Sequence, residues 1–124
     1  MDPRSTHGAF SWVELQGKNA AQTQTFYSEL FGWNPVPMPM QDGSTYPAFA
    51  LGETPLGGFA DKTGIEKQWL PYITVEDVDA TVAKADSAGG KVLNPAFDAP
   101  GVGRIAVLAD PSGAATAVIQ YPKG

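Results

Sequence analysis

The chain has 124 residues, a formal net charge of -5 and no cysteine. Its length fits one compact domain with a modest core, and the lack of cysteine excludes disulfides, thiolate catalysis and cysteine-based zinc sites. The acidic balance opposes the phosphate neutralisation on which nucleic-acid binding depends, so we expect no nucleic-acid partner.

The first residues of the chain predict neither a membrane segment nor a signal peptide. Residues 1–7 are polar, and no stretch approaches the roughly 20 consecutive apolar residues of a membrane helix. We therefore expect a cytoplasmic protein without a membrane partner. Residues 1–7 are predicted to be a flexible leader, and the single histidine, His7, lies within it.

The next residues predict a strand, a helix and three further strands. An alternating strand spans residues 10–16. The helix that follows has Asn19 as its N-cap and Gly32 at the left-handed position after its last turn. Three short extended runs come next, near residues 33–40, 46–51 and 55–60.

Prolines mark the first of these runs as an edge strand. Pro35, Pro37 and Pro39 alternate with apolar residues. Because proline cannot donate a hydrogen bond to a neighbouring strand, we expect this run at the edge of a sheet.

The second half repeats this order at an offset of sixty residues. Trp12-Val13-Glu14-Leu15 aligns with Tyr72-Ile73-Thr74-Val75, and Asn34-Pro35 aligns with Asn94-Pro95. A strand near 69–76 precedes a helix that is capped by Asp77 or Asp79 and stopped by Gly89-Gly90. The last extended runs lie near residues 91–98, 103–109 and 114–121. The sequence predicts an α+β fold of two βαβββ modules, about 8–61 and 68–121, in one domain spanning 8–121.

Alternation along the strands separates two faces of the predicted sheet. The face toward the helices should carry the aliphatic core, which comprises Val13, Leu15, Phe49, Leu51, Ile73, Val75, Ile105, Val107 and Val118. The other face mixes aromatic, small and polar residues, namely Phe10, Trp12, Glu14, Tyr46, Phe59, Tyr72, Thr74, Arg104, Ala106, Ala115 and Ala117. Such a composition is typical of a small-molecule pocket. It also suits packing against a second subunit, and both interpretations can hold for one cleft.

Three segments resemble the vicinal oxygen chelate superfamily, which contains glyoxalase I, extradiol dioxygenases, fosfomycin resistance enzymes and bleomycin resistance proteins. They are Phe26-Tyr27-Ser28-Glu29-Leu30-Phe31-Gly32-Trp33, Asp77-Val78-Asp79-Ala80 with Gly89-Gly90, and Gly103-Arg104 through Asp110-Pro111-Ser112-Gly113-Ala114. The resemblance implies that the two modules form a curved mixed sheet around a cup, with the helices on the outer face. It also implies a homodimer.

The resemblance further implies where a metal would lie in enzymatic members, which hold a divalent ion by His, Gln or Glu side chains. The corresponding first-strand positions fall on Trp12 and Tyr72, and the last-strand positions fall on Gly57 and Ala117. None of these is a usual ligand of a divalent ion. We therefore expect no metal and no other cofactor.

The favoured hypothesis is a metal-free protein that binds an aromatic or cationic small organic molecule, similar to the bleomycin resistance proteins, which sequester a drug without transforming it. Trp12 and Tyr72 would form an aromatic cradle, and Glu14 would add negative charge. Thr74 would contribute a hydroxyl, and Arg104 a counter-charge for a carboxylate or phenolate. The predicted ligand-binding residues are Phe10, Trp12, Glu14, Tyr46, Phe59, Tyr72, Thr74 and Arg104.

Other interpretations stay open from the sequence. The chain could be an enzyme of the same superfamily, a lyase, isomerase or dioxygenase, either with a metal or with Glu14 as a general base. It could also be an interaction module whose partner surface responds to a ligand. Individual residues have structural alternatives, because Trp12 could fill the cup and Arg104 could pair with a nearby carboxylate. No catalytic residue is assigned.

Overall fold

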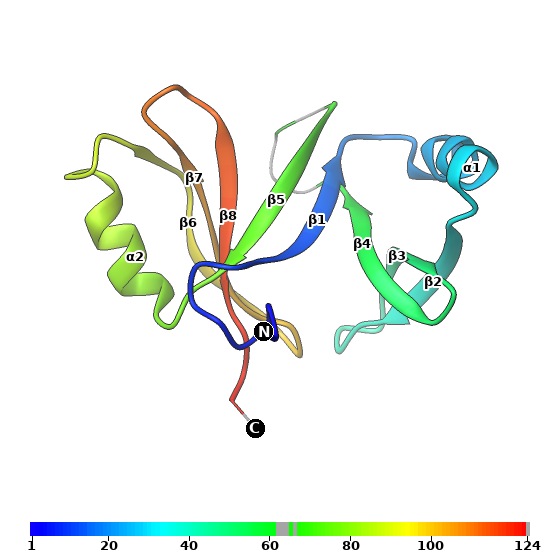
Figure 1. The fold of residues 1–124 in the computed structure, drawn as a ribbon, viewed down its shortest axis with the longest axis horizontal. Helices are drawn as coiled ribbons and strands as arrows, with labels where there is room; N and C mark the ends of the chain where they lie inside the picture. The colour runs from blue at the N-terminus through cyan, green and yellow to red at the C-terminus, as the bar shows by residue number, and fades with distance from the viewer. Residues whose placement is uncertain (62–64, 66, 124) are drawn as a thin grey trace. The chain divides into compact units, whose positions relative to one another are not determined.

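The computed structural model describes residues 1–61, 65 and 67–123 and contains the predicted order of elements twice (Figure 1). The first set is β1 (Phe10–Gln16), α1 (Ala20–Phe31), β2 (Asn34–Pro39), β3 (Thr45–Leu51) and β4 (Thr54–Ala60). The second set is β5 (Gln68–Thr74), α2 (Val78–Ala85), β6 (Lys91–Ala99), β7 (Gly103–Ala109) and β8 (Ala115–Gln120). The α+β class and the two βαβββ modules are confirmed. No helix in the described part of the chain is long and apolar enough to cross a membrane.

The chain divides into two compact units, which nearly coincide with the predicted modules. Unit 2 is Trp12–Trp69, and unit 1 combines Met1–Ser11 with Leu70–Gly124. Unit 1 therefore consists of the second module together with the first residues of the chain.

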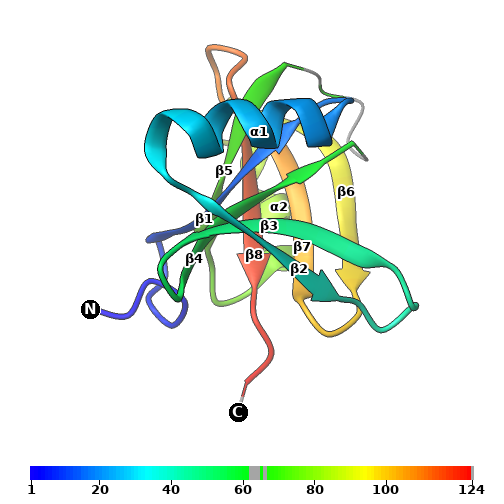
Figure 2. The same cartoon turned by 90° about the vertical axis from the view of Figure 1, so that its right-hand side faces the viewer.

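Unit 2 contains a four-stranded mixed sheet in the order β2-β3-β4-β1. β2 and β3 form an antiparallel hairpin (Figure 2), β3 and β4 are also antiparallel, and β1 runs parallel to β4. β2 lies at the edge of this sheet, as its prolines predict, because an edge strand leaves one row of backbone donors unused.

Aromatic rings form the core of unit 2. The Trp33 ring stacks on Phe49 with centroids 4.3 Å apart, and Tyr27 of α1 stacks on Trp33 at 5.1 Å. Trp69 and Phe59 contact Phe49 at 6.1 Å and 5.4 Å. We call Tyr27, Trp33, Phe49, Phe59 and Trp69 the aromatic cluster. It joins α1 to the sheet through Tyr27.

The prediction of an aliphatic core is only partly correct for unit 2. Phe49 is 1% exposed, but Val13 and Leu51 are 36% and 48% exposed. The helix α1 has no buried residue, and aromatic side chains fill the space over the sheet. Strand alternation identifies a face, but it does not show how far along each strand the helix reaches.

The helix α1 begins and ends where the sequence predicts, but its N-cap lacks the expected side-chain hydrogen bond. Gly32 ends the helix in the left-handed conformation, with φ 74°, and its N–H donates to Ser28 O at 2.9 Å. Asn19 is the N-cap, but it also has a left-handed backbone, with φ 64°, and its side chain makes no capping hydrogen bond. The predicted N-cap position at Asn19 is therefore confirmed, without a capping hydrogen bond from its side chain.

Unit 1 contains four strands of mixed direction, in the order β5-β8-β7-β6, with α2 against one of their faces. β5 is parallel to β8, whereas the pairs β7–β8 and β6–β7 are antiparallel. The core between helix and sheet consists of Val75, Val78, Ala106 and Val118, and Val82, Ala96 and Leu108 pack against it. Asp77 caps α2 by accepting a hydrogen bond from Ala80 N at 3.1 Å.

The strand β7 has the opposite facing from the one predicted. Ala106 pairs with Val118 and lies in the α2-side core, whereas Val107 pairs with Ala117. Ala117 in turn pairs with Tyr72. Ile105 and Val107 therefore share a face with Tyr72, and Arg104 and Ala106 lie on the α2 side. The sequence could not decide this, because β7 is apolar at almost every position and lacks an alternating pattern.

The turn between β7 and β8 holds this register. Asp110 Oδ1 accepts hydrogen bonds from Ser112 Oγ at 2.6 Å, Ser112 N at 2.8 Å and Ala114 N at 3.0 Å. These donors, with the Ser112 hydroxyl first among them, lower the pKa of Asp110 below its ordinary value. The predicted turn at Asp110-Pro111-Ser112-Gly113 is confirmed.

Residues among the first seven make hydrogen bonds with later residues of unit 1. Thr74 Oγ1 donates to Pro3 O at 2.7 Å, and Glu76 N donates to His7 Nδ1 at 3.0 Å. The Arg4 guanidinium lies 5.1 Å from the centroid of the Tyr121 ring. The N-terminal segment thus lies beside the end of β5 and Tyr121.

We predict that Phe49→Ala lowers the free energy of unfolding by about 3–5 kcal/mol, since it removes a buried ring that contacts three others. Leu51→Ala, on the same strand but 48% exposed, is the matched control and should cost less than about 1 kcal/mol. Urea unfolding followed by circular dichroism measures both values. Equal losses for the two variants would contradict the aromatic cluster as the core of unit 2.

Candidate functional site

Three polar or aromatic side chains of β1 lie on the face of the unit 2 sheet opposite the aromatic cluster. Trp12, Glu14 and Gln16 occupy alternate positions, so strand geometry places them on one face. Glu14 is 6% exposed and Gln16 is fully buried, whereas Trp12 is half-buried. A carboxylate in such a position requires hydrogen-bond donors around it, because burying an ionised group without partners is costly.

Tyr46 of β3 completes a hydrogen-bonded chain around that carboxylate. Its hydroxyl donates to Glu14 Oε2 at 2.7 Å and accepts from Trp12 Nε1 at 3.0 Å. Gln16 Nε2 donates to Glu14 Oε1 at 2.6 Å. We call Trp12, Glu14, Gln16 and Tyr46 the Glu14 network. Both carboxylate oxygens have donors, and the indole and phenol rings are held beside them.

Gly58 provides the space in which the Tyr46 side chain extends over one face of the sheet from β3 to Glu14 on β1. Gly58 of β4 pairs with Glu14 on one side and with Ala48 on the other, so it lies directly between β1 and the path of Tyr46. A Cβ at Gly58 would overlap the Tyr46 hydroxyl and the edge of its ring. A residue with any side chain at this position would push Tyr46 away from Glu14.

The Glu14 network combines two features used in ligand recognition. The Trp12 and Tyr46 rings, with centroids 6.4 Å apart and planes inclined at 38°, offer aromatic faces and edges. The carboxylate beside them attracts a cation or accepts a hydrogen bond. Trp12, Glu14 and Tyr46 are three of the predicted ligand-binding residues, and the structure joins them by hydrogen bonds.

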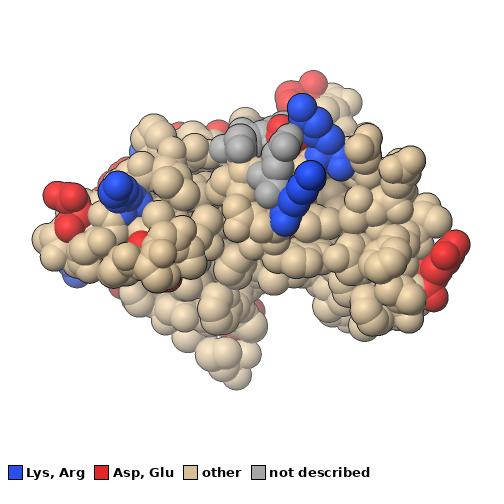
Figure 3. Space-filling model, turned by 90° about the horizontal axis from the view of Figure 1, so that it is seen from above, with Lys and Arg blue, Asp and Glu red and all other residues tan. Residues whose placement is uncertain are grey.

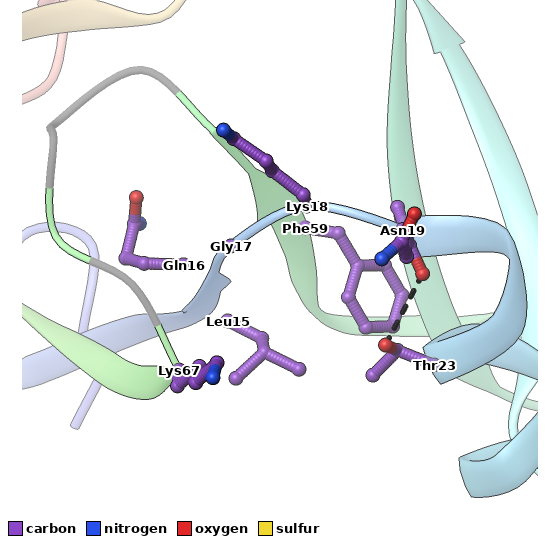
Figure 4. Close-up of a pocket in the computed structure, with 9 residues that line it drawn as sticks. Leu15, Gln16, Gly17, Lys18, Asn19, Thr23, Phe59 and Lys67 are labelled. Atoms are coloured by element: carbon purple, nitrogen blue, oxygen red, sulfur yellow. Dashed lines mark hydrogen bonds between the residues drawn. The ribbon is translucent and has the colours of Figure 1, made fainter.

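Phe59 is a predicted site residue that lies on the other face of unit 2. It pairs with Leu15 rather than with Glu14, and its ring contacts Phe49 in the aromatic cluster. There it lines a cavity of about 260 Å³ at the start of α1, together with Leu15, Thr23 and Lys67 (Figure 4). The prediction that Phe59 shares a face with Glu14 is wrong, because β4 contains a register shift.

That shift explains the failure of the sixty-residue offset in β4. Phe49 pairs with Gly57, but the next residue, Ala50, pairs with Pro55, so β4 has one residue more than β3 at this point. A bulge of this kind reverses the facing of the residues beyond it relative to a regular strand. Phe59 follows the bulge.

Arg104 is engaged on the α2 side of unit 1. Its Nη2 lies 3.0 Å from Asp79 Oδ1, and its Nη1 lies 3.0 Å from Asp98 Oδ1. These hydrogen bonds, that to Asp79 before that to Asp98, raise the pKa of Arg104 above its ordinary value. The prediction that Arg104 shares a face with Tyr72 and Thr74 is wrong, and the ion-pair alternative is confirmed.

The remaining predicted residues belong to unit 1 and differ in exposure. Tyr72 and Thr74 are 7% and 4% exposed, whereas Phe10 is 65% exposed. The Thr74 hydroxyl donates to Pro3 O. A cavity of about 600 Å³ beside it is lined by residues of the N-terminal segment and the chain end, including Arg4, His7 and Tyr121. On the face of the molecule seen in Figure 3, Lys, Arg, Asp and Glu side chains are scattered among uncharged residues.

Sequence reasoning missed one residue of the Glu14 network, Gln16, and the glycine beneath it, Gly58. Gln16 lies two positions after Glu14, and strand alternation alone places both side chains on one face. Gly58 could be found only from the register, because the importance of a missing side chain depends on what lies opposite.

The residues present do not fit the divalent metal that the superfamily resemblance implies. The first-strand positions hold Trp12 and Tyr72, and Tyr72 pairs with Ala117, which has no ligating atom. In unit 2 the expected last-strand position, Gly57, pairs with Val13, and its neighbour Gly58 pairs with Glu14; neither glycine has a side chain. Among the described residues, no group of three or more His, Cys, Asp and Glu side chains could hold an ion. Glu14 already accepts hydrogen bonds on both oxygens.

Comparison with known proteins adds a family match. A family model described as a glyoxalase-like domain matches residues 12–119. A candidate glyoxylase of Mycobacterium tuberculosis, CFP32, is 37% identical over 97% of this chain and 49% of its own length. The anthracycline biosynthesis protein DnrV of Streptomyces peucetius is 31% identical over 93% of this chain and 48% of its own. The chain spans about half the length of the curated relatives it matches.

Solved structures share the fold at low sequence identity. Methylmalonyl-CoA epimerase from Mycobacterium tuberculosis superimposes with a TM-score of 0.62 at 13% identity, covering 96% of this chain and 92% of the epimerase. A hypothetical protein, BH1468, of Bacillus halodurans gives a TM-score of 0.68 at 10% identity, covering 96% of this chain and 98% of that protein. At these identities the comparison supports the fold alone.

We predict that the protein binds less than about a tenth of a divalent ion per chain after dialysis against zinc, nickel, cobalt or manganese, because three or four protein ligands are needed to hold one tightly. Inductively coupled plasma mass spectrometry measures the content. His7→Asn is the control for adventitious binding at the single histidine. If the protein held one ion per chain and Glu14→Gln removed it, the conclusion that these residues do not fit a divalent metal ion would be contradicted.

Proposed function

Because the chain belongs to the glyoxalase-like domain family of the vicinal oxygen chelate superfamily, we propose that it binds a small organic molecule without the help of a metal ion. The observation that carries this proposal is the Glu14 network, in which two aromatic rings stand beside a carboxylate on one face of the unit 2 sheet. Metal-binding members of a fold need ligating side chains, and the positions concerned hold aromatic residues, alanine and glycine.

The chemistry of the Glu14 network favours an aromatic or cationic ligand. An aromatic ring can stack on the half-buried Trp12, and a cation gains both from the ring face and from the Glu14 carboxylate. The net charge of -5 adds a favourable long-range potential for cations. Relatives named for anthracycline biosynthesis, DnrV and DauV, place members of this family in the metabolism of organic small molecules.

An enzyme is the second candidate, and the name of the glyoxylase CFP32 favours it. Glu14 is the buried carboxylate that would serve as a general base, with Tyr46 as its hydrogen-bonded partner. An enzyme would convert a bound compound, and Glu14→Gln would abolish this turnover while binding is retained. That result would favour catalysis over sequestration as the function.

We predict that Glu14→Gln weakens binding of a cationic aromatic probe, such as N-methylquinolinium, at least tenfold, or about 1.4 kcal/mol. The variant keeps the shape of the side chain and removes its charge. Glu53→Gln makes the same charge change at an exposed turn and should alter the affinity less than twofold. Isothermal titration calorimetry measures each affinity. Equal effects of the two substitutions, or no binding across a broad panel of such compounds, would contradict the proposal.

A homodimer is part of the proposal, with α1 as the contacting element. Phe26, Leu30 and Phe31 are 55%, 58% and 56% exposed, an unusual cost for one short helix in water. The relatives are about twice as long as this chain, so a second copy would match their length.

We predict a sedimenting mass of twice the 13.0 kDa of the chain, and dissociation on Leu30→Glu, which places a charge in the apolar surface of α1. Lys84→Glu on α2 is the control and should not change the mass. A monomer at every concentration, or a dimer that Leu30→Glu leaves intact, would contradict the role of α1.

A further inference from the structure

We propose that the Tyr46 hydroxyl occupies a hydroxyl-binding subsite, and that a hydroxylated aromatic ligand takes this subsite by displacing the Tyr46 ring. The inference rests on the proposed binding function and specifies its ligand class further. The Tyr46 side chain would then occupy, in the absence of ligand, the position of the phenol group of the ligand.

The two groups around the Tyr46 oxygen are complementary to a hydroxyl. Trp12 Nε1 donates to this oxygen at 3.0 Å, and Glu14 Oε2 accepts from it at 2.7 Å. A hydroxyl donates one hydrogen bond and accepts others, so it satisfies both neighbours. A carbonyl oxygen would have no proton for Glu14, and an ammonium group would have no lone pair for Trp12. The pair therefore selects for hydroxyl groups.

The floor beneath the Tyr46 ring accepts a flat molecule. Gly58 lies under the ring edge, and a Cβ there would overlap the ring. The neighbour of Gly58 across the sheet is Ala48, another small residue. Glycine and alanine side by side therefore let a planar ring lie close against the sheet.

The Tyr46 side chain can leave without loss of the carboxylate position. Tyr46 is half-buried, so its ring has a route toward solvent. Gln16 is fully buried and donates to Glu14 Oε1 at 2.6 Å, independently of Tyr46. Glu14 therefore stays in place as an acceptor when the phenol moves. A ligand hydroxyl that arrives restores the two hydrogen bonds that Tyr46 gives up, so the exchange leaves no buried polar atom without a partner.

The test removes the Tyr46 ring and supplies its side chain from solution. In Tyr46→Ala we expect p-cresol, which is the tyrosine side chain as a separate molecule, to bind at least tenfold more tightly than toluene, which lacks the hydroxyl. The double variant Tyr46→Ala with Glu14→Leu, which has no hydrogen-bond acceptor in the side chain at position 14, should lose this preference. Tyr46→Phe is the matched second variant, because its ring lacks the two hydrogen bonds that hold the Tyr46 ring, so p-cresol should displace it more readily and bind more tightly than to the wild type. Calorimetry gives the affinities, and circular dichroism verifies that each variant is folded.

Equal affinities for p-cresol and toluene in folded Tyr46→Ala would overturn the proposal. So would a preference for p-cresol that survives in the double variant, since the hydroxyl would then be recognised elsewhere.

The wild-type protein gives a second test that does not depend on the folding of a variant. We expect 2-naphthol to bind at least tenfold more tightly than 2-methylnaphthalene and to shift the indole N–H resonance of Trp12, assigned by its loss in Trp12→Phe. Equal binding of the two compounds would overturn the hydroxyl subsite and leave the proposed binding function standing. Selective binding of p-cresol by Tyr46→Ala, with no wild-type binding of any cationic or aromatic probe, would keep the subsite and overturn the function.

Discussion

The buried carboxylate of Glu14 is the constraint on which the candidate site depends. At 6% exposure it requires donors, and Tyr46 and Gln16 supply one to each oxygen. Satisfying Glu14 fixes the phenol of Tyr46, and the phenol in turn fixes the indole of Trp12. The orientation of the aromatic rings is thus a consequence of one buried charge.

Two neighbouring glycines allow the sheet of unit 2 to pack the aromatic cluster on one face and the Glu14 network on the other. A Cβ at Gly57 would overlap the backbone oxygen of Val13 and lie 2.7 Å from Cζ of Phe49, a member of the aromatic cluster, and a Cβ at Gly58 would overlap Tyr46. The first glycine therefore serves the hydrophobic core, and the second serves the Glu14 network. Both depend on the register of β4, which the bulge beside Ala50 sets. Unit 1 has no such pair at the corresponding point, where Ala117 and Val118 pair with Tyr72 and Ile73.

Part of the site could be predicted from the sequence because short-range geometry determines it. Trp12 and Glu14 are two residues apart on one strand, so alternation puts them on the same face. Tyr46 was assigned to that face by the same argument, and its hydrogen bonds to both residues agree. Arg104 and Phe59 were assigned to the wrong face. Each lies on a strand whose facing depends on pairing with its neighbours, at an apolar run in β7 and after a bulge in β4.

The sequence by itself determined the repeated βαβββ order, the edge position of β2 and the absence of metal-ligating side chains at the family positions. These depend on residue identity and on periods of a few residues, which are local properties. Only the tertiary structure decided which atoms meet: Gln16 and Tyr46 on Glu14, Asp79 on Arg104, and the Tyr46 ring over Gly58. A one-residue change in register moves a side chain to the opposite face of a sheet, and register is set by partners far away in the chain.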